Sequence, residues 1–281
     1  MSAHVAVVTD STAYLPQEEL DRHPITVVPL TVILGDEALE EGTEVSARSL
    51  AAALQRRRTV TTSRPAPELF AEAYRKAADA GATGIVSLHL SAEFSGTYEA
   101  ACLAAEAAPV PVRVVDTRMV AMALGFPVLA AAAAAEAGGS VDEAVAAAQK
   151  RSADTSAYFY VDTLDYLRRG GRIGAAQALL GSALAVKPLL RLDGGRIELM
   201  EKVRTASRAI ARLEEVVAER AGESRVDIAV HHLAATGRAE ALAERLRARV
   251  PGLAELHVSE VGAVIGAHTG PGLLGVIVSA R

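Results

Sequence analysis

The chain has 281 residues and is 51% hydrophobic, which is enough apolar material for one large core or two ordinary ones. Its formal net charge is −5 and both signs are spread along the sequence, so we expect no cationic surface for nucleic acid. The single cysteine, Cys102, excludes an intramolecular disulfide and a cysteine-cluster metal site. We expect neither a bound metal nor a cofactor.

In the first half, short β-branched runs alternate with helical patterns. We expect strands at 4–10, 25–34, 59–63, 84–90 and 112–116, and helices at 46–57, 68–80, 97–108 and 119–137. This alternation indicates βαβ units and a mainly parallel sheet, in which ligands bind beyond the carboxyl ends of the strands. We assign residues 1–152 to this N-terminal α/β domain.

The pattern changes after a further helix at about 138–152. The segment "KPLLRLDGGRIELMEKVR" predicts a hairpin that turns at Asp193, Gly194 and Gly195. The elements expected after it are a helix at 206–221, a strand at 225–233, a helix at 238–250 and strands at 254–261 and 274–280. We therefore expect a two-domain α/β protein whose second domain, 153–281, is a mixed α/β unit.

Nothing in the sequence favours a membrane protein. The start, "MSAHVAVVTDST", goes directly into a strand and a turn, without a charged segment followed by an apolar one. The longest apolar stretch, Met119 to Ala135, contains Gly125 and Pro127 and is dominated by alanine, so it is a poor candidate for a membrane span. We expect a soluble cytoplasmic protein.

Four polar loops stand where strands should end: "TDST" at 9–12, "TTSRP" at 61–65, "EFSGT" at 93–97 and "VDT" at 115–117. In a parallel sheet all four would lie on one edge. Helix capping alone explains any one of them, but together they favour a polar site. In "SGT", Gly96 lets the backbone come close to a ligand while Ser95 and Thr97 each offer a hydroxyl, which suits a carboxylate or a phosphate at a helix N-terminus.

The residues alone leave other site types open. Ser95 would serve as a nucleophile in an acyl hydrolase, although "EFSGT" lacks the G-x-S-x-G pattern. A module that binds some other small anion is a further alternative; the phosphate loops of nucleotide and dinucleotide folds are missing. Four candidate bases fall in or beside strand patterns, where a hydrogen-bonded structural role is the better interpretation: His89, His231, His232 and His257. His268 differs because it stands in a glycine-rich loop.

Taken together, these motifs resemble the DegV family of bacterial fatty-acid-binding proteins. The resemblance runs nearly end to end through "VVTDST", "TTSRP", "EFSGTY", "VVDT", "YLRRGGRIG", "KPLL", the Arg204 region and "IGAHTGPG". It implies an N-terminal domain that encloses an acyl chain, with the carboxylate near the junction with the second domain. It also implies a carrier that presents a long-chain fatty acid to a separate ATP-dependent fatty acid kinase, which makes an acyl phosphate for phospholipid synthesis.

Carried over by motif, Thr62 and Ser95 would bind the carboxylate, and Ser63, Gly96 and Thr97 would shape the same cradle. The resemblance places His268 near the head group, makes Arg172 and Arg204 a positive rim that faces the phosphate or the partner, and implies no catalytic residue in this chain. Arg64 stands where the family usually has Gln, which puts a full charge near the head group or out in solvent.

Overall fold

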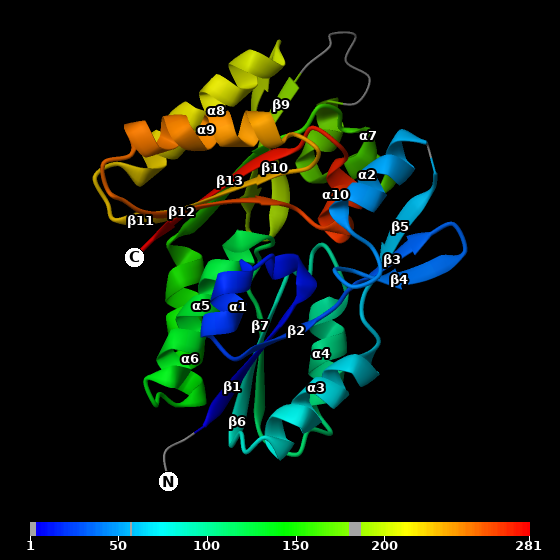
Figure 1. Ribbon diagram of the computed structural model, residues 1–281, viewed down its shortest axis with the longest axis vertical. Coiled ribbons are helices and arrows are strands. Elements are labelled where there is room, and N and C mark those ends of the chain that lie inside the picture. Colours follow the sequence, from blue (N-terminus) through cyan, green and yellow to red (C-terminus); the bar gives the residue numbers. More distant parts are fainter. Residues whose placement is uncertain (1–3, 57, 180–186) are drawn as a thin grey trace. The chain divides into compact units, whose positions relative to one another are not determined.

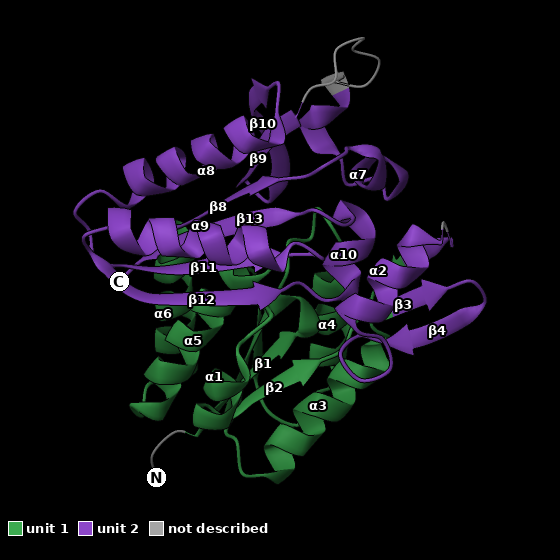
Figure 2. Ribbon diagram, turned by 45° about the horizontal axis from the view of Figure 1, so that its top comes forward, with its two compact units in different colours: residues 1–31, 62–153 green, residues 32–61, 154–281 purple. Residues whose placement is uncertain are grey.

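The computed structural model describes residues 4–56, 58–179 and 187–281 (Figure 1). Within it the chain groups into two compact units, coloured separately in Figure 2. Unit 1 comprises residues 1–31 and 62–153, and unit 2 comprises residues 32–61 and 154–281. The division into folding domains at residues 1–152 and 153–281 stays a prediction, and in this grouping the segment 32–61 goes with unit 2.

Unit 1 is built on a four-stranded sheet whose pairings are all parallel. Its strand order is β2 (Ile25–Val28), β1 (Val5–Asp10), β6 (Gly84–His89) and β7 (Val112–Asp116). Every residue of β6 is buried, because helices cover both faces of the sheet.

Helices α3 (Pro67–Asp79) and α4 (Thr97–Ala105) pack together on one face, and α5 (Met122–Glu136) and α6 (Val141–Ala153) pack together on the other (Figure 1). Two short elements complete the unit, the 3-10 helix η1 (Ser11–Ala13) and α1 (Gln17–Arg22).

Unit 2 contains a six-stranded mixed sheet. Its order is β10 (Arg196–Val203), β9 (Lys187–Asp193), β8 (Thr155–Tyr160), β13 (Leu274–Ala280), β11 (Val226–His232) and β12 (Leu253–Glu260). Strands β11 and β12 are parallel and the other neighbours are antiparallel. Helices α8 (Ala206–Ala221) and α9 (Thr236–Arg249) contribute their apolar faces to one core with this sheet.

The remaining elements are shorter. A three-stranded sheet has the order β4 (Glu37–Glu40), β3 (Thr31–Leu34) and β5 (Val60–Ser63), and the helices are α2 (Ala47–Gln55), α7 (Asp165–Arg169), the 3-10 helix η2 (Gly174–Leu179) and α10 (Ala263–Thr269). Helix α10 packs against both α2 and α7.

The expected fold class, a parallel α/β sheet followed by a mixed α/β unit, is confirmed. The single strand expected at 25–34 is wrong, because the chain forms β2 and β3 in different sheets with Pro29, which has no N–H to donate, between them. Among the described residues, no helix is long and apolar enough to cross a membrane.

Candidate functional site

Three of the four polar loops lie at the carboxyl edge of the unit 1 sheet, as expected. Strand β1 ends at Asp10, β6 at His89 and β7 at Asp116, and the loops "TDST", "EFSGT" and "VDT" stand at these ends. The expectation for the fourth loop is wrong, because "TTSRP" begins within β5, which pairs in the β4-β3-β5 sheet instead of the parallel one.

Two aspartates organise the loops at this edge. Asp10 caps η1, where Oδ1 accepts hydrogen bonds from the backbone N–H of Thr12 at 3.1 Å and from its hydroxyl at 2.5 Å. The Oδ1 atom of Asp116 accepts from the N–H groups of Ala92 at 3.3 Å and Arg118 at 2.9 Å. Both carboxylates therefore hold the loop backbone in place through these hydrogen bonds.

A buried chain of hydrogen bonds runs inward from Asp10. Its Oδ2 atom lies 3.0 Å from Nδ1 of His89, and Nε2 of His89 lies 2.7 Å from the hydroxyl of Ser87. The hydroxyl of Tyr74 on α3 donates to Ser87 at 2.9 Å, and burial raises the pKa of Tyr74 to about 12. All four side chains are fully buried, so His89 has the structural role expected of it.

The "SGT" segment forms the start of α4. The helix begins at Thr97, and Gly96 at its N-cap has no side chain to satisfy the first N–H groups. The hydroxyls of Ser95 and Thr97 lie 2.8 Å apart; Thr97 is buried, whereas Ser95 and Gly96 are partly exposed. Two hydroxyls and a helix N-terminus therefore meet at one point of unit 1, an arrangement that suits an anion.

Arg64, just after the end of β5, approaches the same point. Thr62 is partly exposed, and exposed Ser63 donates its hydroxyl hydrogen to the carbonyl of Arg64 at 3.2 Å. The Arg64 side chain crosses Gly96 so closely that a methyl group added there would lie 2.7 Å from Nη1 and 3.0 Å from Cδ. Arg64 is thus both solvent-exposed and in contact with the first turn of α4.

The expectation for His268 is partly wrong, because it lies on α10 and not in a glycine-rich loop. Its imidazole fills the space over Gly170, where an added Cβ would come within 2.0 Å of Nδ1. Burial, assisted by the nearby Arg172 charge, lowers the pKa of His268 to about 4, so the ring is neutral at neutral pH.

Arg172 and Arg204 also belong to unit 2. The Arg172 guanidinium donates to the carbonyl of Gly170 at 2.5 Å and is partly exposed. Arg204 is exposed in the bend between β10 and α8. The sequence-predicted residues therefore fall in two groups, 62–63 and 95–97 in unit 1, and Arg172, Arg204 and His268 in unit 2. That both groups serve one ligand stays a prediction.

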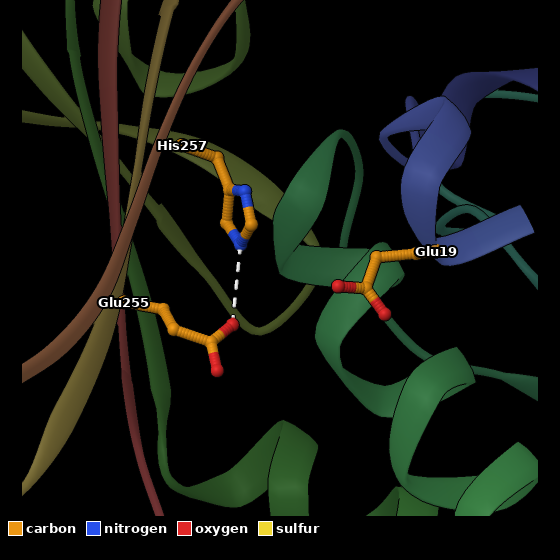
Figure 3. Close-up of side chains that lie close together, drawn as sticks. All are labelled: Glu19, Glu255 and His257. Carbon is orange, nitrogen blue, oxygen red and sulfur yellow. Dashed lines mark ion pairs between the residues drawn. The ribbon is translucent and has the colours of Figure 1, made fainter. Parts of the chain in front are cut away.

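The remaining candidate bases, His231, His232 and His257, lie on strands, as expected. His231 on β11 lies 3.0 Å from the Ser259 hydroxyl, and burial lowers its pKa to about 4. On the neighbouring β12, Nε2 of His257 lies 3.6 Å from a carboxylate oxygen of Glu255, two residues earlier on the same side of the strand (Figure 3). Glu19, also drawn there, belongs to unit 1 and pairs in that unit with Arg22 at 3.0 Å.

Sequence reasoning missed the Asp10 to Tyr74 chain and the contact of Arg64 with Gly96. The i, i+2 spacing of Ser87 and His89 on a strand was the available signal, since it places both side chains on one face. No sequence signal joins Arg64 to Gly96, because they come from different loops.

The two α/β units, together with the polar edge of the unit 1 sheet, define an α/β protein with a hydroxyl-lined helix N-terminus suited to an anionic group. A family model described as "uncharacterised protein, DegV family" matches residues 4–281. The chain belongs to the DegV family. A DegV domain-containing protein of Streptomyces coelicolor is 78% identical over 281 residues, covering all of both chains. Another, of Deinococcus radiodurans, is 40% identical over 278 residues, 97% of each chain.

Solved structures give the same result. A DegV family protein from Thermus thermophilus, described by its fatty acid binding, superposes with a TM-score of 0.93 at 35% identity, covering 99% of this chain and 100% of the other. DegV from Bacillus subtilis, described as a fatty acid binding protein, gives a TM-score of 0.92 at 34% identity with full coverage of both chains.

Proposed function

We propose that this chain binds a long-chain fatty acid and presents its carboxylate to a separate ATP-dependent fatty acid kinase. The kinase would form an acyl phosphate that feeds phospholipid synthesis, and this chain would act as a carrier without phosphoryl-transfer residues of its own. The observation that carries the proposal is the hydroxyl pair of Ser95 and Thr97 at the start of α4, in a chain whose solved relatives are described as fatty-acid-binding.

The head group is proposed to sit at the "SGT" turn. A carboxylate only accepts hydrogen bonds, so it needs donors when it leaves water. Ser95 and Thr62 would donate their hydroxyl hydrogens, while Ser63, Gly96 and Thr97 shape the cradle. The N–H groups of the first turn of α4 add donors and a partial positive charge, which supports this assignment.

Three residues of unit 2 are proposed to act on the same head group. A neutral imidazole still has one N–H to donate, so the lowered pKa of His268 suits a hydrogen bond to the carboxylate without a second charge. Arg172 and Arg204 would face the phosphate or the kinase. Their cations would balance the negative charge that grows as the carboxylate becomes an acyl phosphate.

The acyl tail is proposed to lie among the apolar side chains of unit 1. Phe70 on α3 and Met122 and Leu124 on α5 are fully buried there and are candidate contacts for the tail. Each enclosed methylene contributes about 0.8 kcal/mol, so the tail supplies most of the binding free energy and the head group fixes the orientation.

Two observations favour a carrier over an acyl hydrolase. The Ser95 hydroxyl lies 2.8 Å from the hydroxyl of Thr97, which is not a base. A Ser–His–Asp arrangement does occur in this unit, at Ser87, His89 and Asp10, but all three side chains are fully buried away from the water that hydrolysis consumes.

The experiment that tests this function is calorimetric titration with oleate and, separately, with acetate. A carrier binds oleate tightly and acetate weakly, because acetate has no tail to bury. Incubation of the oleate complex with ATP and a fatty acid kinase should then yield oleoyl phosphate. Equal binding of acetate would favour a small-anion module, and release of acid from an oleate ester without ATP would favour the hydrolase.

A further inference from the structure

The position of Arg64 is unusual for a positively charged side chain. It lies across Gly96, at the N-terminus of α4, where the helix dipole is positive. Cations are disfavoured at this end of a helix, and anions are favoured. Arg64 is solvent-exposed, and within the described residues no ion pair joins its guanidinium to a carboxylate.

The close approach of the Arg64 side chain to the start of α4 depends on the glycine at position 96. Gly96 has an ordinary negative φ of −73°, so its backbone conformation does not require glycine. Any larger residue would instead place its Cβ 2.7 Å from Nη1 and 3.5 Å from Cζ of Arg64. The missing side chain thus lets the guanidinium lie over Gly96, the residue between Ser95 and Thr97, whose hydroxyls lie 2.8 Å apart.

We infer that Arg64 is an anion-binding residue of the head-group site, whose guanidinium pairs with the carboxylate of the acyl ligand beside the hydroxyls of Ser95 and Thr97. This inference rests on the proposed function and deepens it. A carboxylate placed there would meet a cation, two hydroxyls and the helix N–H groups, and would offset the repulsion between Arg64 and the helix dipole. The site would then select acids over neutral lipids of the same chain length.

The test compares Arg64→Gln with the wild type in binding oleate and methyl oleate, which has the same chain but no charge. At low salt, Arg64→Gln should bind oleate about tenfold more weakly, while methyl oleate binding is unchanged. Raising KCl from about 20 to about 300 mM should weaken oleate binding by the wild type more than by Arg64→Gln. Arg64→Lys, which keeps the charge, should retain most of the affinity and the salt dependence.

The matched control is Arg75→Gln, which removes an exposed arginine from α3 of the same unit. It should bind both lipids as the wild type does. The inference is overturned if Arg64→Gln binds oleate as tightly as the wild type, if it loses methyl oleate in the same proportion, or if Arg75→Gln has the same effect. Failure of the wild type to bind either lipid would instead refute the proposed function, and the inference with it.

Discussion

Nδ1 of His89 lies 3.0 Å from Oδ2 of Asp10, and both side chains are completely buried. The contact joins the ends of the neighbouring strands β1 and β6, and the same carboxylate oxygen accepts from the N–H of Leu90 at 3.0 Å. Asp10 therefore holds two of the polar loops at the sheet edge in place.

Asp10→Ala should destabilise unit 1 strongly. The change removes the cap of η1 and leaves the His89 imidazole and the Leu90 N–H buried without their acceptor, so we expect a loss of about 3 kcal/mol in the free energy of unfolding. Urea unfolding measures it. The control Asp79→Ala removes an exposed carboxylate at the end of α3 and should change stability by less than about 0.5 kcal/mol. Equal effects of the two substitutions would contradict the role given to Asp10.

Gly170→Ala should disturb the packing between α7 and α10. The new methyl group would come within 2.0 Å of Nδ1 of the His268 side chain. We therefore expect a loss of about 1–3 kcal/mol in the free energy of unfolding. The imidazole resonances of His268 in an NMR spectrum should shift as the ring moves.

Gly237→Ala is the matched control for Gly170→Ala. Gly237 lies in the first turn of α9, and nothing lies within 4 Å of an added Cβ. Alanine is the better helix former, so stability should be unchanged or slightly higher. If Gly170→Ala is as well tolerated as this control, the close packing of His268 on Gly170 is incorrect.

The buried His231 predicts a loss of stability in acid. Burial lowers its pKa to about 4, below the ordinary value of 6.5, so the unfolded chain takes up a proton at a higher pH than the folded chain does. The contribution of His231 to the free energy of unfolding is complete above about pH 6.5. It is lost as the pH falls towards 4, by up to about 1.4 kcal/mol per pH unit.

His231→Gln should therefore lose less stability than the wild type between about pH 7 and pH 5. Urea unfolding at both pH values gives this difference, and any cost of the substitution that does not depend on pH cancels. His4→Gln, at an exposed position, serves as the control and should follow the wild type. If the free energy of unfolding of His231→Gln falls between these pH values as steeply as that of the wild type, this imidazole does not titrate as described.

The double variant Ser95→Ala with Thr62→Ala should weaken fatty acid binding or slow acyl phosphate formation without unfolding the protein. Each substitution removes one hydroxyl donor from the proposed carboxylate site, and each such hydrogen bond to a charged group contributes about 1.5–3 kcal/mol. Oleate affinity and kinase-dependent turnover are the two readouts, and thermal unfolding checks the fold. Normal turnover in a folded double variant would refute the assignment of the head-group site.

The regular elements were the most predictable part of the fold. The helix expected at 206–221 has those bounds, since its apolar residues recur at helical spacing and Thr205 caps it. Helix α10 could not be predicted in the same way. Its short sequence contains Gly266 and lies between Gly262 and Gly270, so local propensity favours a loop, and packing against α2 and α7 decides the outcome.

The site was predictable in its residue types but only partly in its arrangement. Strand order places "TDST", "EFSGT" and "VDT" on one edge, because carboxyl ends of parallel strands coincide. The position of Arg64 depends on which sheet β5 joins, which is a property of tertiary packing that a four-residue strand does not encode locally.

Native mass spectrometry of the protein purified from a bacterial host tests the central proposal, fatty acid binding, most directly. We predict a one-to-one adduct with the mass of a long-chain fatty acid that dissociates on denaturation, and uptake of oleate or palmitate by any protein that is purified without ligand. A protein that carries no such adduct and takes up neither added acid would contradict it.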